Sequence, residues 1–449
     1  MARDADAAGT PTHPVHAEGR GPILVLYHTN RSPLRASVRD HLYSFSRYSG
    51  RPCIYVNLAV RSLPPLRRLG VEAVVFHTLL LAQRWHPPTF RRLVAKLEPV
   101  RSLRCHKVAI PQDDYIHTSA LIDFIREFGV DRVLSCAPET EWRTIYGDIV
   151  DGPTRFTRVL PGYLEPATLR RIAHLRQSAG PRTIDIGYRA WRPDYSLGRH
   201  ALLKAQVGEV FATSAAEQGL RADISLRDED TILGDDWYRF MLRCRWMIGV
   251  EGGASLLDRD GSVRERTAAY RTNNPSASFD EVEAACFPGL DGSIHLVSIS
   301  PRHLEACATG TAQVLVEGSY NGVLEPELHY IPVRADFSNV NDVLTRLKDD
   351  ELRVRIVAQA YTDVVASGRF EYAAFVRESL SGVPASRSAI RGVVARYALR
   401  WERSLDRPTW VWIWIRWRTR QAVRKVLDRM GLLDRVLRVR AERSLRAEG

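Results

Sequence analysis

Short apolar runs alternate along most of the chain with longer segments whose apolar positions recur every three or four residues. Short continuous apolar runs are typical of strands buried on both faces, and the longer segments have the spacing of amphipathic helices. Strands that alternate with helices predict a parallel sheet covered on both faces. In the first half of the chain, strands are expected at 22–27 (PILVLY), 53–56, 72–77, 107–111 and 132–135. Helices are expected at 38–48, between the third strand and about residue 97, and at 120–128.

A second set of alternating elements begins near residue 182. It is separated from the first set by a joining region near residues 160–180. Two such units predict an α/β protein with two lobes, and ligands of parallel sheets bind beyond the carboxyl ends of the strands, in the cleft. Strands are expected at 183–187, 221–226, 246–250, 313–317 and 330–333, helices at 199–218, 237–243 and 301–308, and a loop-rich insertion at 255–294.

The chain has 449 residues, which is too long for one compact core. The first segment, 1–20, offers nothing large to bury and is expected to be disordered. The N-terminal Rossmann-like lobe is expected at 21–170 and the C-terminal one at 171–385. The remaining segment, 386–449, is predicted to form a basic, tryptophan-rich helical tail.

The net charge of +12 is concentrated in this tail. Residues 391–449 contain 16 Arg plus Lys and 6 Asp plus Glu, a net of +10, which leaves about +2 for the rest of the chain. A nearly neutral body argues against a nucleic-acid-binding protein. The six cysteines show no CxxC or zinc-ligand spacing, which favours reduced thiols in a cytosolic protein. Neither a signal peptide nor a spanning run of about 20 apolar residues is visible.

The most specific motif lies at 300–318, which reads SPRHLEACATGTAQVLVEG and continues through Tyr320, Gly322, 329–331 and 336–338. This segment resembles the C-terminal lobe of GT-B glycosyltransferases of the family 1 and family 4 group. The resemblance implies two Rossmann-like lobes with parallel sheets facing a central cleft, and a nucleotide-sugar as co-substrate. It also implies that the chemistry needs no divalent metal, so neither a metal ion nor a cofactor is expected.

The same motif predicts a helix that begins at the cleft. Ser300 stands at the capping position before a proline, and a glycine, Gly310, is suited to end the helix. The resemblance implies that Glu305 accepts the hydroxyls of the donor ribose and that Arg302, Thr309 and Gly310 belong to the donor site. The alternative is a capped surface helix whose glutamate pairs with an arginine.

One feature departs from the family pattern. Many members carry a second acid in an E-x7-E motif, and counting back from Glu305 reaches the apolar Val297. That acid is often assigned to the transferred sugar. Its absence keeps open a second hypothesis, a non-catalytic protein that binds a nucleotide-sugar or serves in an assembly.

Two further segments are candidates for binding the donor diphosphate. The resemblance implies that Arg189 and Lys204 hold it, because positive charge there stabilises the leaving group. The segment 251–255 (EGGAS) follows a strand, and its glycines would allow backbone N–H groups to approach a ligand. The alternatives are ordinary solvated side chains and a tight turn. Glu251, Gly252, Gly253 and Ser255 are therefore also candidate donor-binding residues.

The acceptor side is expected in the N-terminal lobe. His28, His77 and Asp114 each follow a predicted strand, which would direct them into the cleft. A His or Asp there could orient or deprotonate an acceptor hydroxyl. The alternative for each is a structural role.

The tail carries the sequence WVWIWIRWRTR at 410–420. On a helix, Trp410, Trp414 and Trp417 would share one face, flanked by Arg416, Arg418 and Arg420. Tryptophan favours the membrane interface and arginine favours anionic headgroups. The alternatives are packing on the body or a partner subunit, and nucleic acid. The sequence thus predicts a bacterial-type glycosyltransferase that acts on a glycan or lipid-linked acceptor, peripheral on the inner face of the cell membrane.

Overall fold

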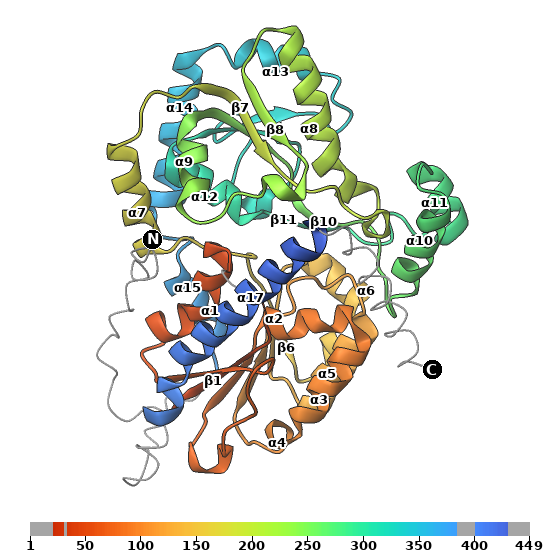
Figure 1. Ribbon diagram of the computed structural model, residues 1–449, viewed down its shortest axis with the longest axis vertical. Coiled ribbons are helices and arrows are strands. Elements are labelled where there is room, and N and C mark those ends of the chain that lie inside the picture. The colour runs from red at the N-terminus through yellow and green to blue at the C-terminus, as the bar shows by residue number, and fades with distance from the viewer. Residues whose placement is uncertain (1–20, 31–33, 384–399, 430–449) are drawn as a thin grey trace.

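The computed structural model describes residues 21–30, 34–383 and 400–429. Two α/β lobes lie one above the other, each built on its own parallel sheet (Figure 1). This arrangement confirms the predicted architecture of two Rossmann-like lobes with a helical C-terminal region. The expected disordered segment, 1–20, lies outside the described residues.

The N-terminal lobe contains a six-stranded parallel sheet in the order β2-β1-β3-β4-β5-β6. The strands at 23–27, 53–57 and 73–76 are buried along their whole length, as their continuous apolar runs predict. The strands are β1 (Ile23–Tyr27), β2 (Cys53–Asn57), β3 (Ala73–Phe76), β4 (His106–Ala109), β5 (Arg132–Ser135) and β6 (Arg155–Arg158), and the helices are α1 (Ala36–Tyr48), α2 (Thr78–Leu81), α3 (Pro87–Lys96), α4 (Glu98–Arg101), α5 (Thr118–Phe128) and α6 (Trp142–Tyr146).

The C-terminal lobe contains a five-stranded parallel sheet in the order β13-β12-β9-β7-β8. Helices cover both of its faces, so apolar side chains of the strands form a core with the helices. The strands are β7 (Ile184–Arg189), β8 (Ala222–Ser225), β9 (Cys244–Gly249), β12 (Ala312–Val316) and β13 (Ile331–Val333), and the helices are α7 (Pro166–Gln177), α8 (Arg199–Glu217), α9 (Asp235–Arg243), α12 (Pro301–Thr309), α13 (Val340–Arg346) and α14 (Asp350–Ala360).

The predicted insertion is a separate substructure that joins the lobes at one side. It leaves the C-terminal lobe through the antiparallel pair β10 (Gly252–Ala254) and β11 (Leu296–Ser298) and carries α10 (Ser262–Asn273) and α11 (Phe279–Cys286). Its backbone bonds to the N-terminal lobe, where His117 N donates to Asp258 O at 2.7 Å. The insertion therefore links the two lobes through backbone hydrogen bonds at one side of the molecule (Figure 1).

The chain crosses back to the N-terminal lobe before residue 385. Beyond α14, α15 (Tyr372–Ser379) packs against α1, and its apolar residues join the core of the N-terminal lobe. The two crossings lie side by side, because Leu164 N donates to Phe370 O at 2.7 Å and Tyr372 N donates to Leu164 O at 3.1 Å. The expected extent of the second lobe, 171–385, is thus too long at its end, because this apolar helix face is buried against α1.

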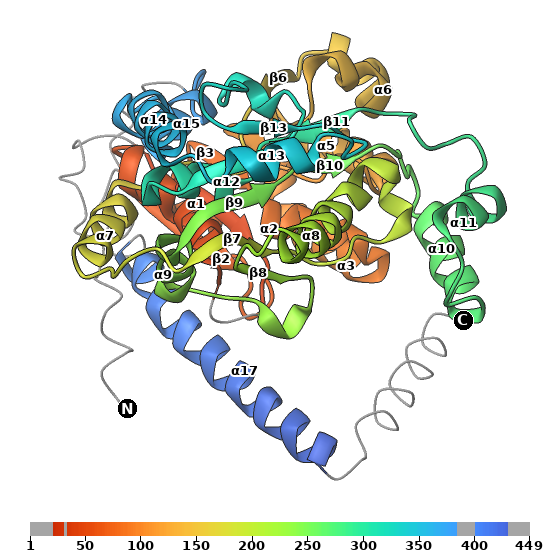
Figure 2. The same ribbon diagram turned by 90° about the horizontal axis from the view of Figure 1, so that it is seen from above.

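The helix α17 (Asp406–Arg429) ends the described chain. Its first turns pack on the N-terminal lobe beside β2, and the rest of the helix leads away from both lobes (Figure 2). No helix in the described part of the chain is long and apolar enough to cross a membrane.

Candidate functional site

A cavity of about 280 Å³ lies between the two lobes. The N-terminal lobe contributes the start of α1 and the residues that follow β3. The C-terminal lobe contributes the end of β7, the loop 227–234 and the first residues of α9 and α12. The cavity therefore lies where the carboxyl ends of both parallel sheets meet, which is the position that the sequence predicts.

Glu305 lines this cavity from the second turn of α12. The helix begins after Ser300 with Pro301 in its first turn, and Gly310 ends it in a left-handed conformation with φ of 63°, as predicted. The Trp237 indole donates to Glu305 Oε2 at 2.8 Å. Burial raises the pKa of Glu305 to about 7, against the opposing effects of this hydrogen bond and of Arg302. The carboxylate is thus held in position at the cavity wall.

Two cations lie near each other on the C-terminal side of the site, and Arg302 is the one in the cavity wall with Glu305. Arg302 lines the cavity and donates to the backbone oxygen of Arg189 at 2.7 Å. Burial lowers the pKa of Lys204 to about 8; the nearby charge of Arg302 acts in the same direction, and that of Asp113 opposes it. The Lys204 ammonium lies 5.8 Å from the ring centroid of Trp191, a half-exposed side chain at the cavity. The arrangement places positive charge next to a carboxylate and an aromatic face.

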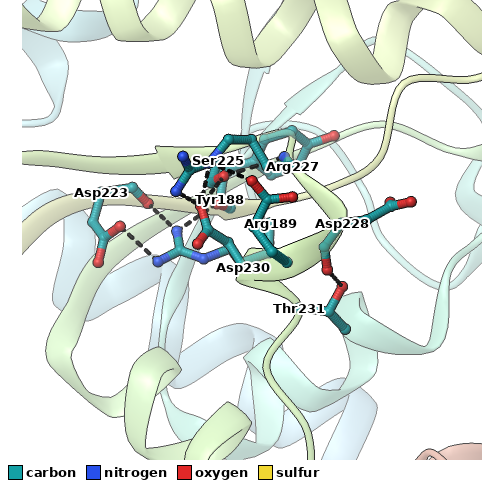
Figure 3. Close-up of polar contacts among 9 residues, drawn as sticks. Tyr188, Arg189, Asp223, Ser225, Arg227, Asp228, Asp230 and Thr231 are labelled. Atoms are coloured by element: carbon teal, nitrogen blue, oxygen red, sulfur yellow. Dashed lines mark hydrogen bonds and ion pairs between the residues drawn. The ribbon is translucent and has the colours of Figure 1, made fainter. Parts of the chain in front are cut away.

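Arg189 lines the cavity, but its guanidinium is engaged within the C-terminal lobe. It forms an ion pair with Asp223 at 2.7 Å (Figure 3). It also lies 4.4 Å from the ring centroid of Phe240. The predicted pair of Arg189 with Lys204 is therefore not brought together, because Arg189 binds to the neighbouring strand β8. Arg302 is the arginine whose charge acts on Lys204.

The polar side chains of the segment that begins with Glu251 form hydrogen bonds within the C-terminal lobe. The buried Glu251 carboxylate accepts hydrogen bonds from Ser319 N at 3.0 Å and Tyr320 N at 2.7 Å. Ser255 donates to Asp291 at 2.7 Å and accepts from the backbone of His200 at the start of α8. The expected donor contacts of Glu251 and Ser255 are corrected accordingly, since these groups are satisfied inside the lobe.

The two glycines of the same segment allow a close approach of β10 to β11. Gly253 has φ of 145°, and a side chain there would collide with Leu296 O. Gly252 pairs with Ser298, and a side chain at this position would reach 3.9 Å from Lys204 Nζ. Gly252 therefore borders the cationic part of the site, whereas Gly253 has a structural role.

Gly252 pairs with Ser298 across β10 and β11, so the segment between them leaves the lobe and returns to the point where it left. Val297, which is reached by counting back from Glu305 in the sequence, is apolar and buried in β11.

Thr309 and Gly310 do not line the cavity. Thr309 is buried, and its hydroxyl bonds to Glu305 O at 3.0 Å and to Thr311. A helix of nine residues is about 14 Å long, which places its last residues far from a ligand at its start. The donor contacts predicted for both residues are corrected, and they terminate α12.

On the N-terminal wall, His77 is buried with both ring nitrogens engaged. Nδ1 accepts from Leu79 N at 3.1 Å, so a neutral ring carries its proton on Nε2, which lies 2.9 Å from Nδ1 of His41. Burial keeps the pKa of His77 well below its usual value and lowers that of His41 to about 4. His41, on α1, therefore carries its proton on Nε2.

His41 is a cavity residue that was not singled out from the sequence, as are Trp191 and Trp237. It lines the cavity, and within the described part of the chain Nε2 has no hydrogen-bond partner. Its ring packs against Phe375 of α15 at a centroid distance of 4.7 Å. No motif marks this histidine, because its surroundings come from a helix more than 300 residues away.

The other predicted acceptor residues lie outside the cavity wall. His28 is half-buried, and burial together with Lys96 lowers its pKa. Asp114 is buried in the N-terminal lobe, where Ser135 donates to it, and burial raises its pKa to about 6. The side chain of Asp114 turns into the lobe, so its predicted catalytic position is corrected. Within the described residues, no group of three or more His, Cys, Asp or Glu side chains could hold a metal ion.

The predicted membrane-contact residues of the tail differ in their exposure on α17. Trp410 stacks on Tyr27 at a centroid distance of 6.2 Å and donates to Tyr43, so its expected membrane contact is corrected. Trp417 is half-buried, whereas Trp414 is exposed. Arg416 and Arg418 are exposed, and the side chain of Arg420 lies outside the described residues.

No protein-family model matches the chain, and no curated protein matches it either. Among solved structures, the chain is similar to HepE from Anabaena in complex with UDP-glucose, with 12% identity, coverage of 81% of this chain and 100% of that chain, and a TM-score of 0.40. It is also similar to a glycosyltransferase from Rickettsia africae (10% identity, 81% and 98% coverage, TM-score 0.41). Sucrose-phosphate synthase from Thermosynechococcus elongatus gives 12% identity, 80% and 97% coverage, and a TM-score of 0.42. These likenesses concern the fold alone.

Proposed function

We propose that this protein transfers a sugar from a nucleotide-sugar donor to a glycan or lipid-linked acceptor. One observation carries the proposal: Glu305 and Arg302 line an interlobe cavity, and the buried Lys204 lies near Arg302 and the ring of Trp191. A nucleotide-sugar presents the matching groups, which are ribose hydroxyls, a diphosphate and a base.

Each wall has a distinct role in this proposal. The Glu305 carboxylate accepts hydrogen bonds from the ribose hydroxyls, with Trp237 holding its other side. Arg302 and Lys204 neutralise the diphosphate as it leaves, which is the main electrostatic demand of the reaction. Trp191, half-exposed at the cavity, offers an aromatic face to the base.

We assign the N-terminal contact to His41 rather than to His77. A neutral His41 that is protonated on Nε2 donates a hydrogen bond to an oxygen of the substrate in the cavity. His77 orients the ring of His41 and fixes its tautomer. His77 is therefore a positioning residue.

The second candidate is a protein that binds the nucleotide-sugar without transferring it. The enclosure of the Glu251 carboxylate by Ser319 and Tyr320 favours this alternative, because a carboxylate that is bonded there does not contact the transferred sugar. Release of the nucleoside diphosphate from a bound donor in the presence of a lipid-linked glycan fraction distinguishes a transferase from a binding protein.

The donor site is tested by thermal denaturation of the full chain with UDP-, GDP-, dTDP- and CDP-sugars. A ligand at about 100 times its dissociation constant stabilises a fold by about 2.7 kcal/mol. We expect one nucleotide to raise the melting temperature and Glu305→Ala to abolish the shift. Glu351→Ala is the matched control, because Glu351 is an exposed glutamate in the first turn of α14. A folded chain that responds to none of these donors would overturn the proposal.

A further inference from the structure

The helix α17 is fixed to the N-terminal lobe by one of its faces. Tyr43 donates to the Asp406 carboxylate at 2.7 Å, Trp410 packs on Tyr27, and Ile413 is buried. These three positions follow the i, i+4, i+7 spacing of a single helix face. The orientation of the opposite face is therefore set by the protein.

The opposite face exposes a compact set of large apolar side chains. The relative exposures are 53% for Val411, 43% for Trp412, 46% for Trp414 and 50% for Ile415. Val411 and Ile415 lie one turn apart at the middle of this face, with one tryptophan on each side. We call these four residues the outer face of α17. Four neighbouring exposed apolar side chains mark an interaction surface more strongly than single ones would.

Arginines accompany both tryptophans of the outer face. The guanidinium of Arg416 lies 4.3 Å from the ring centroid of Trp412, and that of Arg418 lies 5.0 Å from that of Trp414. The whole helix contains seven Arg plus Lys and two Asp, a net of +5 in 24 residues. The apolar side chains thus lie within a strongly positive surface.

The position of the helix leaves this face accessible. A helix of 24 residues is about 36 Å long, and beyond its first turns it leads away from the lobes (Figure 2). An apolar strip with tryptophans at its borders and arginines beside them is typical of helices that lie in the interface of a bilayer. Nucleic acid would use the arginines but would leave Val411 and Ile415 exposed to water.

We infer that the outer face of α17 is a docking surface for an anionic lipid bilayer, on which the helix lies in the plane of the interface. Val411 and Ile415 enter the boundary of the acyl chains, the tryptophans lie at the headgroup level, and the arginines pair with lipid phosphates. This inference rests on the proposed function, whose acceptor is a glycan or a lipid-linked molecule, and it names the surface on which the protein would meet a lipid-linked one. The face of α17 that carries Asp406, Trp410 and Ile413 holds the N-terminal lobe, and with it His41, against the bilayer. That bilayer would carry a lipid-linked acceptor.

The test is cosedimentation of the full chain with vesicles of phosphatidylglycerol and phosphatidylcholine, compared with vesicles of phosphatidylcholine alone. We expect binding to the anionic vesicles that weakens as the salt concentration rises. The double variant Trp412→Ala, Trp414→Ala should lower the partition coefficient by about tenfold or more. The double variant Arg416→Gln, Arg418→Gln should lower it about 25-fold, at about fivefold for each charge.

The matched control removes two exposed arginines from the other end of the N-terminal lobe. Arg126→Gln, Arg143→Gln changes the net charge by the same amount and should bind within about twofold of the wild type. All substituted side chains are exposed, so the melting temperatures should stay unchanged and show that each variant folds.

Three results would overturn the inference. The first is a folded tryptophan variant that binds the vesicles like the wild type. The second is a lipid-free dimer that the same variant abolishes, because the outer face would then bind a second copy. The third is duplex DNA binding that depends on Arg416 and Arg418 but not on the tryptophans. Vesicle binding needs no sugar donor, so its outcome is separate from that of the thermal denaturation test.

Discussion

On the C-terminal wall of the cavity, Glu305 and Arg302 come from the first two turns of α12, whereas on the N-terminal wall His41 comes from α1 and His77 follows β3. The first pair is joined by one helix start, and a short motif describes it. The second pair is joined by a hydrogen bond between segments 36 residues apart. The relative position of Glu305 and Arg302 thus follows from neighbouring residues of one helix. The relative position of His41 and His77 depends on tertiary packing.

The largest expected effect concerns the two cations on the C-terminal side of the site. Lys204→Gln, Arg302→Gln should lower the affinity for the donor diphosphate about 100-fold, because each charged hydrogen bond contributes about 1.5 kcal/mol. Arg189→Gln should change it less than about threefold, since this guanidinium is bound to Asp223. Calorimetric titration with the nucleoside diphosphate checks both. A larger loss of affinity in Arg189→Gln would support the predicted binding of the diphosphate by Arg189 together with Lys204.

On the N-terminal wall, His41→Ala should lower kcat about tenfold with little change in donor affinity, because it removes one hydrogen bond to the substrate. His77→Ala should act only through His41. The double variant should therefore be no slower than His41→Ala, which a double-mutant cycle measures. Additive losses would show that His77 contacts the substrate itself.

The pH dependence of donor binding distinguishes two groups on the C-terminal side of the site. Affinity should rise with pH through about 7 as Glu305 ionises and should fall above about 8 as Lys204 loses its charge. Glu305→Gln should remove the rise, and Lys204→Arg should remove the fall. Titration of the nucleotide at pH 5.5 to 9.5 measures both limbs.

The same raised pKa predicts the sign of a stability effect. The pKa of Glu305 is higher in the folded chain than the value of about 4.3 expected in the unfolded chain. Its contribution to stability is full below pH 4 and is lost as the pH rises through about 7. Glu305→Gln should therefore melt at a higher temperature than the wild type at pH 8, and the difference should vanish at pH 4. A difference in melting temperature that stays the same from pH 4 to pH 8 would contradict a raised pKa of Glu305.

The smallest effect on activity is expected for Asp114→Asn. Asp114 is buried with Ser135 inside the N-terminal lobe, so the variant should react within about twofold of the wild-type rate. Steady-state kinetics checks this value, and Asp123→Asn serves as a control on the same lobe. A rate about 100-fold lower would place Asp114 among the catalytic groups and would contradict the contrast between the two walls.

The sequence predicted the helices and strands better than it predicted where the polar side chains point. A strand followed by a polar residue correctly located the edge of each sheet, yet the Asp114 side chain points into its own lobe and the Arg189 guanidinium pairs with Asp223 at the cavity wall. Both side chains find partners on neighbouring strands, and those partners follow from strand order. Likewise, the helical spacing of the tail was correct, but Trp410 lies on the face that packs against Tyr27.

What the sequence by itself determined is local: the buried strands, the start and end of α12, and the position of Glu305 on it. These depend on apolar periodicity and on capping within a few residues. The tertiary structure decided the rest, because the surroundings of a side chain come from segments far apart in the chain. Only in the folded chain does Gly252 pair with Ser298 and α15 pack against His41. The folded chain also determines which face of α17 is exposed to solvent.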